Sequence, residues 1–206
     1  MRSLILSATS GSWLLFVARK VDPTFQRFRE KVFERDQHTC QYCGFQAHQY
    51  QEVINIDGNY KNNKLSNMLT ACCFCTQCLF LEAVGKNDYG GGSLIYLPDL
   101  GQADLNGLCH VLFCAIANAT SYRTDAQNVY RNLKLRSQQV EEHVGEGMSN
   151  PARLGQMLID ANIDDRQQLA DKILSKVRLL PSRSKFSEQI EVWAQAALNE
   201  MAEQKG

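Results

Sequence analysis

Two pairs of cysteines in this sequence have the spacing of metal ligands. Cys40 and Cys43 form one Cys-x-x-Cys pair, and Cys72 and Cys75 form another. Thiolates are soft ligands that suit zinc, and two such pairs supply the four ligands of a tetrahedral site. A zinc ion held by four thiolates has no open position for water or substrate. The spacing therefore predicts one structural Zn²⁺ rather than a catalytic metal.

The second pair has an alternative, because Cys75 and Cys78 have the same spacing. We favour Cys72 over Cys78, since Cys72 and Cys75 fit a knuckle at the junction of a loop and a helix. Gly44 directly follows the first pair and suits the left-handed backbone of such knuckles. His38 and His48 flank the first pair as possible substitutes, but we expect both to be loop residues outside the metal shell.

Composition narrows the class of protein. The 22 basic residues equal the 22 acidic ones, whereas nucleic-acid binders usually carry a basic excess that neutralises phosphates. No apolar run approaches the roughly 18 residues of a membrane helix, and polar residues interrupt the N-terminal stretch where a signal peptide would need a continuous apolar segment. We therefore expect a cytoplasmic protein that does not insert into a membrane. Its cysteines should then be reduced.

The first hundred residues predict mixed secondary structure. We expect short strands around 4–6 and 13–18, and a helix beginning at Asp22-Pro23, which fit an N-cap and a first helical position. Further along, weak alternation of apolar and polar residues predicts a strand at 52–57. We also expect a helix at 72–84 and a strand at 94–97. Gly90-Gly91-Gly92 is interpreted as a loop without phosphate-binding character, because it matches no P-loop or dinucleotide fingerprint.

The second hundred residues predict mainly helices. Apolar periodicity indicates a buried helix at 105–119 and another that ends near Val144-Gly145. Asn150-Pro151 predicts the start of a third helix. Asp164 with Gln167 predicts a fourth helix, which should turn Leu169, Ile173 and Val177 inward. After Pro181, a final helix carries one apolar stripe from Ile190 to Met201, interpreted as core-facing with a partner surface as the alternative.

Two segments resemble the zinc-bearing HNH endonuclease module: residues 35–44, which hold the first cysteine pair, and residues 65–75, which hold the second. In such nucleases a histidine on the intervening strand activates water. Here Asn55 stands at that position, and an amide cannot accept a proton at neutral pH. Thr76 follows the second pair where the nucleases often carry a metal-binding His or Asn. The resemblance implies a ββα-metal-like zinc scaffold without catalytic residues.

A closer resemblance extends through most of the chain. The motifs that carry it are Gly11-Ser12-Trp13, Ala18-Arg19-Lys20, Asn55-Ile56-Asp57-Gly58, Leu65-Ser66-Asn67 and Ala71-Cys72-Cys73-Phe74-Cys75. The chain is similar to the IcmJ (DotN) family of Dot/Icm type IVB secretion systems in intracellular bacteria. That resemblance implies a coupling-complex subunit that binds the C-terminal extension of the coupling ATPase alongside other adaptor proteins. It also implies association with the inner-membrane complex through this partner.

The resulting prediction is an α+β fold in which an HNH-like ββα zinc module, residues 1–100, packs with a mainly α-helical region, residues 101–206. The predicted function is a non-catalytic adaptor that helps to recruit effector proteins. The alternatives are an HNH-type DNA endonuclease and a non-catalytic nucleic-acid binder on the same scaffold. The replacement of the general base by Asn55 disfavours the first, and the neutral net charge disfavours the second.

Overall fold

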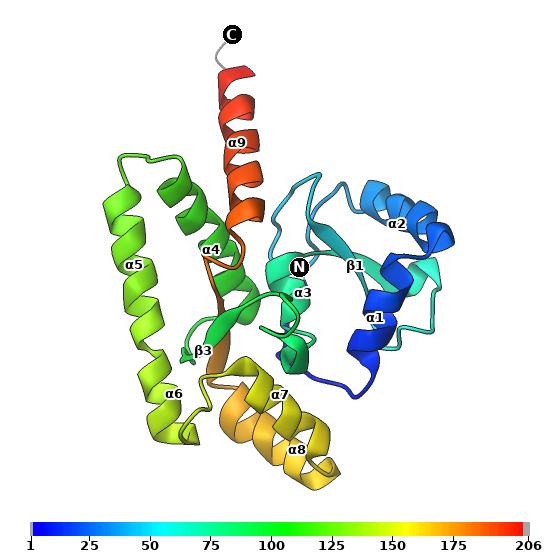
Figure 1. Ribbon diagram of the computed structural model, residues 1–206, viewed down its shortest axis with the longest axis vertical. Helices are drawn as coiled ribbons and strands as arrows, with labels where there is room; N and C mark the ends of the chain where they lie inside the picture. Colours follow the sequence, from blue (N-terminus) through cyan, green and yellow to red (C-terminus); the bar gives the residue numbers. More distant parts are fainter. Residues whose placement is uncertain (1, 204–206) are drawn as a thin grey trace.

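The structure is a computed structural model that describes residues 2–203, and its fold class is α+β, as predicted (Figure 1). The helices are α1 (Ser12–Lys20), α2 (Pro23–Arg35), α3 (Cys73–Gln77), α4 (Gln102–Ala117), α5 (Arg123–Leu135), α6 (Ser137–Val144), α7 (Pro151–Asp160), α8 (Ile163–Leu169) and α9 (Ser187–Glu203). The strands are β1 (Gln51–Asn55), β2 (Met68–Cys72), β3 (Gly92–Tyr96) and β4 (Val177–Pro181). Short helical turns lie at η1 (Leu65–Asn67), η2 (Leu81–Ala83) and η3 (Ala170–Leu174).

The four strands form two antiparallel pairs. In the first pair β1 lies beside β2, with Val53 opposite Thr70. In the second pair β3 lies beside β4, with Leu94 opposite Leu179. The first pair is local, whereas the second joins segments more than 80 residues apart in the chain. Residues from both of the predicted regions therefore share the second sheet.

The N-terminal segment differs from its prediction. Residues 13–18 were predicted as a strand but lie within α1, where Phe16 and Arg19 are buried three residues apart on one helical face. Residues 4–6 are extended without joining a sheet. Leu4 and Leu6 are buried there, and the nearby Ser7 exchanges backbone hydrogen bonds with Cys78 and Leu81.

Helix α2 begins as its sequence predicts. The side chain of Asp22 caps the helix by accepting a hydrogen bond from the backbone N–H of Thr24, and Pro23 occupies the first turn. Its apolar residues form a small cluster with the β1–β2 hairpin. The buried members are Phe25, Val32, Phe33, Val53 and Met68. One face of the hairpin is thereby covered by α2, and the other face turns toward the main core.

Two helical predictions were too long. The helix predicted at 72–84 ends at Gln77, and the chain then turns so that Leu81 N–H can bind the carbonyl of Ser7. The helix predicted to include Val177 ends earlier, because Val177 begins β4 and pairs with Tyr96. In both places a contact with a distant segment overrides the local apolar period.

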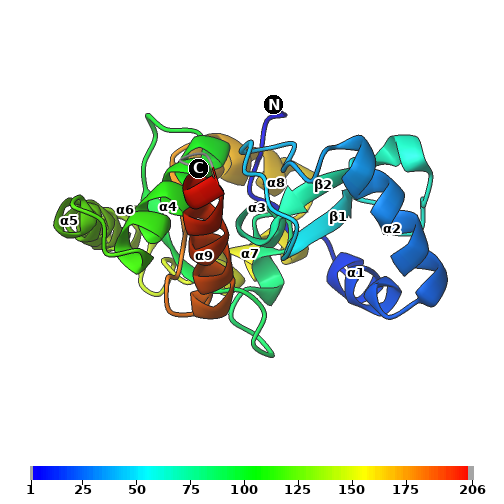
Figure 2. The same cartoon turned by 90° about the horizontal axis from the view of Figure 1, so that it is seen from above.

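Helix α4 lies at the centre of the molecule. It contacts α3, α5, β4 and α9, so the main core is continuous from the cysteine-bearing hairpin into the helical region. Seen from above, α1 and α2 lie at one side and α5 at the opposite side (Figure 2). Among residues 2–203, no helix is both long and apolar enough to cross a membrane.

Candidate metal centre

The first cysteine pair lies in a tight loop held by backbone hydrogen bonds. Cys40 N–H donates to the carbonyl of Phe45, and Gly44 N–H donates back to the carbonyl of Cys40. Gly44 has a φ of 76°, the left-handed conformation that was predicted for it. Gln41 N–H binds the carbonyl of Thr70, which fixes this loop against β2 and thus beside the second pair.

The second pair follows at the end of β2. Cys72 is the last residue of that strand, and Cys75 lies in the first turn of α3. The hydroxyl of Thr76 donates to the carbonyl of Cys72 at 3.0 Å, which holds the turn between strand and helix. A strand edge and a helix start therefore position the two thiols.

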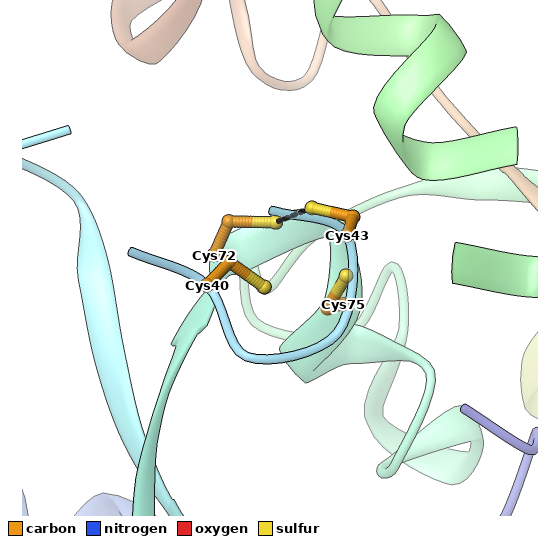
Figure 3. A group of neighbouring side chains, drawn as sticks. All are labelled: Cys40, Cys43, Cys72 and Cys75. Atoms are coloured by element: carbon orange, nitrogen blue, oxygen red, sulfur yellow. Dashed lines mark hydrogen bonds between the residues drawn. The ribbon is translucent and has the colours of Figure 1, made fainter. Parts of the chain in front are cut away.

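The four sulfur atoms converge on one point (Figure 3). All of them lie within 4.8 Å of one another, and the Sγ atoms of Cys43 and Cys72 are 3.7 Å apart. Zinc–sulfur bonds of about 2.3 Å would place tetrahedral ligands about 3.8 Å apart. The four cysteines therefore fit one zinc ion, which would be bound by Cys40, Cys43, Cys72 and Cys75. Cys40, Cys72 and Cys75 are buried and Cys43 is half-buried.

The electrostatics of the cluster also fit a cation. Hydrogen bonds from Cys43, Cys72 and Cys75 lower the pKa of the Cys40 thiol. Burial raises the pKa of Cys72 and Cys75. Four ionised thiolates in this buried volume would repel one another, so full deprotonation needs a compensating positive charge.

The other candidates lie outside the group of four sulfurs. The Sγ of Cys78 donates to the carbonyl of Phe74 at 3.2 Å. His38 and His48 lie beside each other, with ring centroids 4.3 Å apart, and neither belongs to the group of four. Cys109 and Cys114 lie on α4, as buried and half-buried free thiols.

Helix α4 supplies hydrogen-bond donors to the sulfur atoms. Asn106 Nδ2 lies 3.2 Å from the Sγ of Cys75 and 3.8 Å from that of Cys78. Gln102, one turn earlier, orients this amide by donating from Nε2 to Asn106 Oδ1 at 3.0 Å. Gln102 also binds the backbone carbonyl and N–H of Leu179 in β4. A buried chain of hydrogen bonds thus runs from the second sheet to the cysteine cluster.

His110 is the second donor from α4. Its Nε2 lies 3.3 Å from the Sγ of Cys72, and burial lowers the pKa of the imidazole to about 3. The ring stands between two parallel aromatic rings, with centroids 3.6 Å from Phe45 and 4.3 Å from Phe74. A neutral His110 would donate its single N–H to a thiolate, which stabilises the negative charge on the sulfur.

Our sequence interpretation missed these three α4 residues. Gln102, Asn106 and His110 recur every fourth position, so they lie on one face of a mainly apolar helix. All three are buried. A stripe of polar residues at this spacing was the available signal, because buried polar groups need partners. The sequence does not show that those partners are cysteines.

Asn55, the residue at the predicted general-base position, is buried and fully engaged. Its Oδ1 accepts a hydrogen bond from Arg19, and its Nδ2 donates to the carbonyls of Asn59 and Asn62 at 2.8 and 2.9 Å. Arg19 is buried against the rings of Phe25 and Tyr60. These contacts give Asn55 a structural role in ordering the loop that follows β1.

The carboxylate of Asp57, which belongs to this loop, is surrounded by donors. Asp57 accepts hydrogen bonds from the side-chain amides of Asn62 and Asn67 and from the backbone N–H of Asn59. The bond from Asn67 is the largest of the effects that lower the pKa of Asp57. A magnesium ion would need several oxygen ligands, whereas here the neighbouring amides turn N–H groups toward the carboxylate.

Comparison with known proteins identifies the family. No family model matches the chain. However, the curated protein "Type 4 apparatus protein DotN" from Legionella pneumophila is 56% identical over 200 residues, covering 97% of this chain and 93% of that protein. The chain belongs to the DotN family. The resemblance to this family in the sequence is therefore confirmed, and the match extends through both the cysteine-bearing hairpin and the helical region of the chain.

Proposed function

We propose that the protein is a zinc-stabilised, non-catalytic subunit of a type IVB secretion coupling complex, where it binds the C-terminal extension of the coupling ATPase. The observation that carries this proposal is the identity of 56% to a type 4 apparatus protein along nearly the whole chain. The resemblance to this family implies that the partners are the ATPase extension and the neighbouring adaptor proteins. Through these partners the protein would act at the cytoplasmic side of the inner membrane.

The geometry of the metal centre supports a structural metal. Four thiolates would saturate a single zinc ion, which leaves no coordination site for water. Asn55 cannot accept a proton from water and is already held by Arg19 and two backbone carbonyls. With Mg²⁺ or Mn²⁺, we therefore expect no nicking of supercoiled plasmid. Nicking that disappears in Asn55→Ala would show a nuclease instead.

The decisive experiment is binding of the zinc-loaded full chain to the C-terminal extension of the coupling ATPase, measured by isothermal titration calorimetry. We expect a saturable complex with one copy of each partner. A scrambled peptide of the same composition is the control. If a folded, zinc-loaded protein does not bind the extension, the proposed function is wrong.

A further inference from the structure

A groove lies beside the metal centre, between helix α9 and the loop after the first cysteine pair. We call it the Trp193 groove. It has a volume of about 370 Å³ and is lined by Phe45, Gln46, Ala47, His48, Gln49, Val192, Trp193, Ala196, Ala197 and Glu200. A smaller apolar cavity of about 70 Å³ adjoins it and shares Phe45, Trp193 and Ala197. The lining is mostly apolar and includes small residues, which suits close approach of another helix.

The walls of this groove are tied to the metal centre. Trp193 meets Phe45 edge-to-face, with centroids 4.9 Å apart, and its indole N–H donates to the carbonyl of Gln49 at 3.1 Å. Phe45 in turn stacks on His110, which lies 3.3 Å from the Sγ of Cys72. Both walls are therefore fixed in place before any partner binds, which lowers the entropic cost of binding.

Helix α9 continues past the groove and extends beyond the rest of the molecule (Figure 1). Two apolar side chains in the C-terminal part of this helix are exposed, Leu198 at 43% and Met201 at 55%. Met201 follows Ala197 by four residues and Trp193 by eight, so it lies on their side of the helix, whereas Leu198 lies on the adjoining flank. Met201 therefore extends the apolar row of Trp193 and Ala197 toward the end of α9.

The charge of α9 selects among possible occupants. The helix carries Glu188, Glu191, Glu200 and Glu203 and contains no Lys or Arg. Glu200 lines the groove itself. A second copy of this chain docked through the same face would bring acidic residues together, which is unfavourable. A partner with Lys or Arg beside its apolar face would instead be attracted.

From these observations we propose that the Trp193 groove and the exposed end of α9 dock an amphipathic helix of a protein partner, one with basic residues flanking its apolar face. The apolar side chains of that helix would enter the groove, and its basic residues would lie near Glu200. This inference rests on the proposed function only for the identity of the partner, which is taken as the ATPase extension.

The test uses the zinc-loaded full chain and overlapping peptides that cover the ATPase extension. Ala196→Arg puts a long cationic side chain into the groove at an exposed helical position. Glu200→Lys replaces the acidic side chain that lines the groove with a basic one. Leu14→Arg is the matched control, because Leu14 is 71% exposed on α1, away from α9 (Figures 1 and 2). Zinc content and circular dichroism establish that each variant is folded.

We expect one peptide with an apolar face and adjacent Lys or Arg residues to bind the wild type. Ala196→Arg should weaken its affinity by at least about tenfold, which corresponds to about 1.4 kcal/mol. Glu200→Lys should weaken it less and reduce its salt dependence, and Leu14→Arg should leave it unchanged.

Unchanged affinity in Ala196→Arg, with the wild type still binding the extension, would overturn the docking surface while the proposed function stands. A wild-type dimer that Ala196→Arg dissociates, measured by sedimentation, would identify a second copy as the occupant and also overturn it. If the wild type binds no part of the extension, the proposed function fails, and the assignment of this groove to the extension fails with it.

Discussion

If the four cysteines bind zinc, the negative charge of their thiolates would have to be balanced by more than the metal ion. A zinc ion carries two positive charges and four thiolates carry four negative ones, so the complex would retain negative charge in a buried site. Asn106 and His110 donate hydrogen bonds to Cys75 and Cys72 and partly compensate for that charge. These donors should therefore influence how tightly zinc is held.

His110→Phe tests this role, because phenylalanine keeps the ring between Phe45 and Phe74 but removes the N–H. We expect zinc affinity to fall by about 10- to 100-fold. Competition with a chromogenic chelator measures this affinity, and the thiolate-to-metal charge-transfer band of the cobalt-substituted protein should shift. Cys114→Ser, on the same helix, is the control. Cys40→Ser should lose zinc outright. If His110→Phe changes neither the zinc affinity nor the charge-transfer band of the cobalt-substituted protein, the hydrogen bond from His110 does not help to hold zinc.

The buried carboxyl group of Glu82 should make the stability of the protein depend on pH. Both of its carboxylate oxygens are buried without a partner among the described residues, and burial raises its pKa from 4.5 to about 6. The folded state therefore holds the proton more tightly than the unfolded state does. The stability that the protonated Glu82 contributes to the folded state is fully present below about pH 4.5. It is lost as the pH rises through about 6.

Glu82→Gln removes the ionisable group and should raise the melting temperature by a few degrees at pH 8. At pH 4, where the carboxyl is protonated in both states, the variant and the wild type should melt alike. Thermal unfolding followed by circular dichroism at several pH values measures the difference. A difference that is constant across this pH range would show that ionisation of Glu82 does not affect stability.

At the scale of elements, sequence reasoning succeeded where local chemistry decides. Helices α2 and α7 begin where Asp22-Pro23 and Asn150-Pro151 predict, because a side-chain cap and a proline act within one turn. It failed for residues 13–18, since a short apolar run suits a strand or a helix equally. It also missed β4, whose partner β3 lies more than 80 residues earlier in the chain.

The contact between α7 and the turn η2 leaves no room for a side chain at Gly155. A Cβ atom there would lie 2.3 Å from the backbone nitrogen of Glu82. Gly155→Ala should therefore force the two elements apart and lower the free energy of unfolding by about 1–3 kcal/mol. Chemical denaturation with urea measures this change.

Gly107→Ala in α4 is the matched control for the Gly155 substitution. At Gly107 a Cβ atom would make only an ordinary contact of 3.6 Å with the carbonyl oxygen of Cys43. Alanine also favours a helix interior, so this variant should gain about 0.5–1 kcal/mol. Equal effects of the two alanines would show that the close approach at Gly155 does not control the docking of α7.

At the scale of the whole molecule, the α+β class could be predicted, but the joint between the two regions could not. The cysteine spacing marks the hairpin, and apolar periodicity marks the helices, because both signals are local. The joint consists of the β3–β4 sheet and the chain from Leu179 through Gln102 and Asn106 to Cys75. The polar stripe of α4, Leu179 in β4 and Cys75 are distant from one another in sequence, and no spacing relates them.

This joint leads to a prediction about the two regions. Residues 1–100 alone would lose α4, with its donors to Cys72 and Cys75, and β4, the partner of β3. Core residues such as Phe74 and Leu94, now fully buried, would be exposed. We expect the fragment to unfold without cooperativity and to bind zinc more weakly than the full chain. Adding residues 101–206 in trans should restore both properties, measured by urea denaturation and chelator competition. A fragment 1–100 that folds cooperatively and holds zinc as tightly as the full chain would show that the metal centre does not depend on the helical region.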